Sequence, residues 1–91
     1  MLCDCINSNF GTKTSGSIND ITASGVHFVG NAVTGKPNNW SGAGTGGMVI
    51  SAYAGVDNYI YLYFKNSADA SGIVWMHRKA GGTDNGWIQL I

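Results

Sequence analysis

Several residue types that favour helices are scarce in this chain of 91 residues. Its acidic side chains are five aspartates and no glutamate, and it has only one glutamine and one proline. By contrast, 14 glycines and nine asparagines are spread along the whole length. Residues of high helix propensity are therefore few, whereas residues that form turns are abundant. This composition predicts an all-β fold, a small antiparallel β-sheet or sandwich.

Charge is also scarce. Charged residues make up 11% of the chain and the formal net charge is zero, so the sequence lacks the basic surface that binds nucleic acid or an anionic membrane. It has no run of 18 apolar residues, and its first residues lack the basic and long apolar regions of a signal peptide. We therefore expect no nucleic-acid partner, no membrane insertion, and synthesis in a cytoplasm.

Clusters of reactive side chains are lacking as well. The aspartates and the two histidines are scattered one per turn or strand, without a phosphate loop, a nucleophile elbow or paired carboxylates. Cys3 and Cys5 are one residue apart, so a disulfide between them would be strained, and two thiols alone are too few to hold a metal. We interpret them as reduced thiols or an interchain contact. His27 is either part of a partly covered strand face or a functional group. We expect no enzymatic activity, no metal and no cofactor.

The most informative segment that is present is NYIYLYF, at residues 58–64. Successive side chains of a β-strand point to opposite faces, so Tyr59, Tyr61 and Tyr63 share one face and the intervening Ile, Leu and Phe share the other. Neither face is properly polar. We predict that the aliphatic side lines the core, and that the tyrosine side, apolar in its rings and polar at its hydroxyls, forms an interface between subunits or a ligand platform.

Turn signals divide the rest of the chain. Residues 1–17 are predicted to be an N-terminal lead-in or linker, and residues 18–91 a single all-β domain. A short strand is expected at residues 26–29, followed by a long polar loop at 30–47. Residues 47–91 are expected to form a four-stranded antiparallel meander, with turns at residues 54–58, 65–72 and 80–86. A domain of this size is marginally stable alone, and association with another chain would add to its stability.

The order of these segments resembles the knob-type repeat of phage tail fibres and R-type pyocin fibres, over about residues 18–91. The resemblance is carried by INDI at 18–21, GVHFV at 25–29, a polar loop with Pro37, GMVI at 47–50, the aromatic strand, MHR at 76–78 and GWIQLI at 86–91. Members of that family commonly have two tryptophans near the C-terminus, whereas this chain has Trp87 followed by Ile88, Gln89 and Leu90. The resemblance implies a knob-like homotrimeric module of a virion fibre or spike, lying at or near the tip and touching the host surface.

A sugar-binding site needs an aromatic ring for the apolar side of the sugar, and amide or carboxylate groups for its hydroxyls. Two segments combine these groups, namely Trp40 with Asn38 and Asn39, and Trp87 with Asp84 and Asn85. The alternatives stay open: Trp40 can fold back as a lid on the core, and Trp75 and Trp87 can be core or cross-strand partners.

Three hypotheses for function follow. The first is a receptor-binding tip module of a phage fibre, a homotrimer that attaches the virion to a host polysaccharide or protein receptor. The second is a structural virion module that binds no host ligand. The third is a small lectin-like adhesion domain that acts as a monomer.

Overall fold

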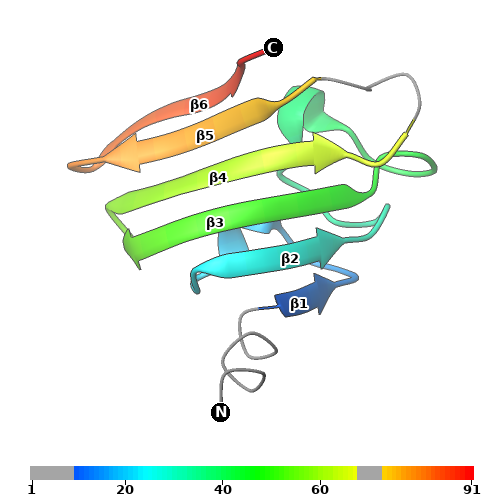
Figure 1. Cartoon of the computed structure of the whole chain (residues 1–91), viewed down its shortest axis with the longest axis horizontal. Helices are drawn as coiled ribbons and strands as arrows, with labels where there is room; N and C mark the ends of the chain where they lie inside the picture. Colours follow the sequence, from blue (N-terminus) through cyan, green and yellow to red (C-terminus); the bar gives the residue numbers. More distant parts are fainter. Residues whose placement is uncertain (1–9, 68–72) are drawn as a thin grey trace.

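The computed structural model in Figure 1 describes residues 10–67 and 73–91 of the chain, apart from the side chain of Phe10. Its strands are β1 (Phe10–Lys13), β2 (Gly25–Val29), β3 (Gly47–Gly55), β4 (Asn58–Lys65), β5 (Trp75–Ala80) and β6 (Thr83–Gln89). They form one six-stranded sheet in the order β1 to β6. The prediction of a small all-β fold is confirmed, and the described strands form a single sheet rather than a sandwich.

Strand pairing confirms the predicted meander. The pairs β3–β4, β4–β5 and β5–β6 are all antiparallel, and β2 joins the sheet antiparallel to β3. The strand β1 runs parallel to β2 at the edge of the sheet. It falls within residues 1–17, which the sequence analysis assigned to a lead-in, so the sheet begins earlier than predicted.

Two strand boundaries also differ from the prediction, because the hairpin turns are shorter than expected. Only two residues separate β3 from β4, and only Gly81 and Gly82 separate β5 from β6. Both glycines have positive φ, 58° and 82°, which suits the tight turns that match strand twist. The turn predicted at residues 80–86 is therefore too long, since β6 already starts at Thr83. The other predicted turn, at 65–72, lies partly outside the described residues.

Two irregular segments, residues 14–24 and 30–46, form a layer on one side of the sheet, and we call them the covering layer (Figure 1). Each contains one short 3-10 helix, η1 (Ile18–Asp20) and η2 (Pro37–Asn39). Ser17 caps η1, because its hydroxyl accepts the Asn19 amide while its own amide donates to the Asp20 carboxylate. These bonds satisfy amides at the start of the helix that have no intrahelical acceptor.

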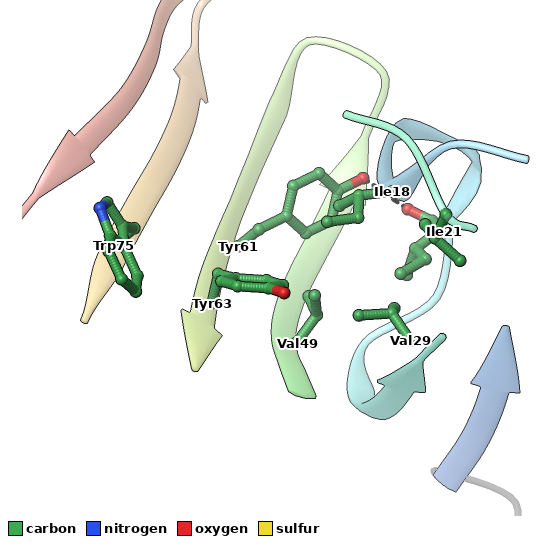
Figure 2. Packing of buried hydrophobic residues seen from close by; sticks show 8 residues of the cluster. Ile18, Ile21, Val29, Val49, Tyr61, Tyr63 and Trp75 are labelled. Carbon is green, nitrogen blue, oxygen red and sulfur yellow. Dashed lines mark hydrogen bonds between the residues drawn. The ribbon is translucent and has the colours of Figure 1, made fainter. Parts of the chain in front are cut away.

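The core lies between the covering layer and the tyrosine side of β4, which we call the inner face. Tyr61 and Tyr63 are completely buried, and Ile18 and Ile21 of the covering layer pack against this face (Figure 2). The remaining core members come from both layers and are Val29, Val33, Val49 and Trp75.

This arrangement reverses the predicted roles of the two faces. Tyr61 and Tyr63 are enclosed by their own subunit, so the prediction that they lie at an interface between subunits is wrong. Tyr59, on the same face, is partly buried and its ring packs on those of Tyr53 and Tyr61. The physical reason is hydrogen bonding: the Tyr61 hydroxyl donates to the carbonyl of Ile21 at 2.6 Å, and that of Tyr63 donates to the carbonyl of Thr45. With both hydroxyls bonded, burial of the rings carries no unsatisfied polar group.

The opposite side of the sheet, which we call the outer face, carries large apolar side chains that no described segment covers. Phe28 is 52% exposed, and Ile50, Ile60 and Ile88 are also exposed. The remaining large apolar members of this face are partly exposed, namely Val26, Met48, Leu62, Phe64 and Met76. The side predicted to line the core is therefore the one left facing solvent.

Candidate functional site

Trp40, the first candidate for ligand binding, lies in the covering layer just after η2 and is partly buried. Its ring meets Trp75 edge to face, with centroids 4.8 Å apart, and lies 6.4 Å from the ring of Tyr63. The ammonium of Lys65 stands 4.4 Å from the centroid of the Trp40 ring. Trp40 therefore acts as a lid on the aromatic core, and a cation–π contact with Lys65 occupies part of its surface.

Asn38 and Asn39 are exposed beside Trp40, and both have positive φ, 57° and 56°. Asparagine tolerates this left-handed backbone better than most residues, so the pair turns the chain sharply and still presents two amide side chains to solvent. Exposed amides next to an aromatic ring are the arrangement that the sequence analysis sought for a sugar site.

Trp87, the second aromatic candidate, lies on β6 and is also partly buried. Its indole N–H donates to the carbonyl of Gly35 at 2.7 Å, and its ring packs on those of His77 and Tyr63. Trp87 is thus a cross-strand partner that also ties β6 to the covering layer. The same hydrogen bond brings Trp87 close to the loop that carries Asn38, Asn39 and Trp40.

The remaining members of the second group are Asp84 and Asn85 on β6. A carboxylate oxygen of Asp84 accepts hydrogen bonds from Nε2 of His77 at 2.6 Å and from the amide of Gly86 at 2.8 Å. The Gly86 amide and, after it, His77 hold the pKa of Asp84 below its usual value, although burial acts the other way. Asn85 is exposed. Asp84 therefore has a structural role in the β5–β6 hairpin, while Asn85 presents its amide to solvent.

His77 was not singled out by sequence, yet it lies on the inner face between Tyr61 and Trp87 and is 6% exposed. Its Nε2 carries the proton donated to Asp84, so in the neutral ring Nδ1 is a bare acceptor. This Nδ1 is buried and has no hydrogen-bond partner among the described residues. The alternation of β5 places His77 beside Trp75 on the inner face, and this was the one signal for it in the sequence.

Lys36 is the other residue that the sequence analysis missed. Its side chain is 1% exposed inside the covering layer, where Nζ donates to the carbonyl of Asn31 at 2.9 Å and to the hydroxyl of Thr45 at 3.0 Å. Both acceptors are neutral, and burial lowers the pKa of the Lys36 ammonium from its usual value. A lysine in a loop rich in glycine and asparagine gives no sign in the sequence that it is buried.

His27 lies on the inner side of β2, where its Nε2 is 3.1 Å from the carbonyl of Ala23 and 3.2 Å from the hydroxyl of Ser51. These contacts join β2, β3 and the covering layer.

Cys3 and Cys5 lie outside the described residues. Within residues 10–67 and 73–91, no three or more His, Cys, Asp or Glu side chains are grouped so that they could hold a metal ion. Over the same residues, no helix is long and apolar enough to span a membrane.

The candidate site is therefore the edge where the covering layer meets β6. It combines the partly exposed rings of Trp40 and Trp87 with the exposed amides of Asn38 and Asn39, whereas Asn85 lies further along β6, toward the β5–β6 turn. Comparisons with family models, curated proteins and solved structures find no match to this chain.

Proposed function

We propose that this chain is a tip module of a phage tail fibre or spike, which works as a homotrimer and attaches the virion to a glycan or another receptor on the host surface. The observation that carries the attachment part is the hydrogen bond between Trp87 and Gly35. It holds the loop of Asn38, Asn39 and Trp40 beside β6, so that this loop and Trp87, about 45 residues apart in sequence, contribute to one edge of the domain.

The chemistry of this edge suits a neutral sugar. Its exposed polar groups are mainly amides, which can both donate to and accept from hydroxyl groups, and partly exposed indole rings offer an apolar platform. The Lys65 ammonium over Trp40 and the carboxylate of Asp84 are both engaged in contacts within the chain. We therefore expect the ligand to be recognised by hydrogen bonds and ring contact rather than by charge.

A glycan array tests this proposal. Replacing Asn38 and Asn39 together by glycine removes both amides and keeps a residue that accepts positive φ. We expect binding to weaken by roughly 2-fold to 10-fold for each hydrogen bond lost, which corresponds to about 0.5–1.5 kcal/mol. The matched control is Asn19→Gly, because Asn19 is an exposed asparagine in η1 that belongs neither to the candidate site nor to the outer side of the sheet.

A second candidate function is a structural virion module that binds no host ligand. The internal contacts of Trp40 and Trp87 favour it, because both rings already stabilise the core. Equal and featureless glycan signals from the wild type and from the Asn38, Asn39 variant would support this alternative and contradict the attachment proposal. The remaining hypothesis, a lectin-like domain acting as a monomer, requires glycan binding by a sample that sediments as a single chain.

A further inference from the structure

We infer that the outer face is the surface through which copies of this chain associate, and that the outer faces of other copies cover it. This inference rests on the proposal that the module works as an assembly of identical chains. It places the contact on the side of the sheet opposite to the tyrosine side, which the sequence analysis had favoured.

A continuous row of apolar side chains crosses the outer face from β2 to β6. The strand register places neighbouring members of this row directly opposite each other, in the order Val26, Ile50, Leu62, Met76 and Ile88. A second row, toward the end of the sheet where β2 stops, consists of Phe28, Met48 and Phe64. The apolar surface is thus one connected patch and not a scatter of single exposed residues, which would need no explanation.

The outer face is wide enough for contact between copies. With strands about 4.8 Å apart and a rise of about 3.3 Å per residue, the plan area of the five strands β2–β6 is roughly 550 Å², and the apolar patch covers about half of it. In a homotrimer the three outer faces turn toward one axis and together remove roughly 1,650 Å² from water, whereas stable interfaces bury about 1,200–2,000 Å². The area is therefore sufficient to hold the copies together.

The charge of the face favours a second copy over a charged partner. Arg78, beside Ile60, is the one charged residue that strand alternation places on the outer face in the described part of the chain. One cation at the margin of an apolar patch is too little to hold nucleic acid or an anionic membrane. An apolar face is complementary to itself, so an identical chain matches it without any partner of special chemistry.

The shape of the outer face also allows the side chains of two copies to interdigitate. A hollow of about 300 Å³ lies beside Phe28 and is lined by Met48, Phe64 and neighbouring residues. Phe28 itself is the most exposed side chain of the patch. A protruding ring next to a hollow is the shape that packs against a copy of itself, because each chain then supplies both the knob and the recess.

Equilibrium sedimentation of the whole chain tests the inference. We expect the wild type to sediment at micromolar concentration as a multiple of 9.6 kDa, and Ile50→Lys, which places a charge in the central row, to sediment as a single chain with an unchanged circular dichroism spectrum. The matched control is Val56→Lys, since Val56 is 68% exposed in the turn between β3 and β4 and lies outside the patch. It should assemble like the wild type. A monomeric wild type, or an Ile50→Lys variant that assembles normally, would overturn the inference.

A second measurement needs no variant and decides the matter if Ile50→Lys fails to fold. Met48 and Met76 lie on the outer face, and peroxide oxidises exposed methionines faster than buried ones. Their oxidation should become several-fold faster when the wild type is diluted to the point of dissociation; rates independent of concentration would overturn the inference.

The proposal of glycan attachment and the inference of association through the outer face can fail independently of each other. A monomer that binds glycans leaves attachment standing without this interface, whereas an assembly that binds none leaves the interface standing without attachment.

Discussion

Alkaline conditions should unfold this protein within a pH window set by two buried tyrosines. Burial raises the pKa of Tyr61 and of Tyr63 from the ordinary 10.0 to about 12. Below pH 10 both the native and the unfolded chain hold these protons, so the free energy of unfolding does not depend on them. Between pH 10 and about pH 12 the unfolded chain loses the protons while the native chain keeps them, and stability falls as pH rises.

The expected loss is large compared with the stability of a small domain. One unit of pKa difference corresponds to about 1.4 kcal/mol, so each phenol contributes up to roughly 3 kcal/mol and the two together roughly 5 kcal/mol. Whole domains are stable by about 5–15 kcal/mol, and this one is small. We therefore expect most of its stability to be lost before both native phenols can ionise, and ionisation to coincide with unfolding.

Urea titrations at a series of pH values, followed by circular dichroism, give the free energy of unfolding, and absorbance near 295 nm reports the phenolates. Tyr61→Phe and Tyr63→Phe serve as controls. Each should be less stable near neutral pH, by about 1 kcal/mol for the lost hydrogen bond, and each should show a clearly smaller alkaline decline, since the raised pKa values of the other phenol and of Tyr59 remain. The reasoning is refuted if either variant keeps the full decline, or if the two phenols ionise near pH 10 while the chain stays folded.

Three further predictions concern single positions. Lys36→Met should abolish the rise in unfolding free energy that the wild type shows as pH increases through the lowered pKa of Lys36 toward 10.5, measured by urea titration. Gly47→Ala should destabilise the chain by about 1–3 kcal/mol, because the added Cβ would collide with the carbonyl oxygen of Phe64. The control is Gly55→Ala, also in β3. A Cβ at Gly55 meets open space, so this variant should change stability by less than about 0.5 kcal/mol. Trp87→Phe should lower the melting temperature through loss of one hydrogen bond worth about 1 kcal/mol, and an unchanged value would contradict the role assigned to its N–H.

The sequence predicted the strands well where side-chain alternation was strong. Residues 58–64 alternate strictly, and β4 runs from Asn58 to Lys65 with that alternation preserved. The turns were less predictable. The segment 80–86 contains glycine, aspartate and asparagine, which favour turns, but only Gly81 and Gly82 form the turn, because pairing with β5 draws Asp84 and the following residues into a strand. Tertiary pairing overrides local propensity at such positions.

The sequence could not predict which residues of the polar loops are buried. Residues 30–46 are rich in glycine and asparagine, as an exposed flexible loop would be, yet Val33, Lys36 and Pro37 are almost completely buried. Val33 belongs to the core cluster with Tyr61 and Tyr63, which are distant in sequence, and the Lys36 ammonium is enclosed by acceptors of Asn31 and Thr45. Trp40 shows the same limit: nothing in its local sequence indicates that its ring packs on the core, and only its distance to Trp75 shows this contact.

The choice of face has a physical explanation that joins the fold to the proposed assembly. A buried tyrosine hydroxyl needs a fixed acceptor, and carbonyls of regular strands are already engaged in the sheet ladder. Irregular segments have carbonyls to spare, and the covering layer supplies those of Ile21 and Thr45. The outer side of β4 carries Ile60, Leu62 and Phe64, which need no acceptor, and Asn58, whose amide oxygen already accepts from the Gly81 amide, so another sheet can cover this side with side chains alone. The chain's own loops therefore cover the face with hydroxyls, and the face without them is the one suited to a second copy.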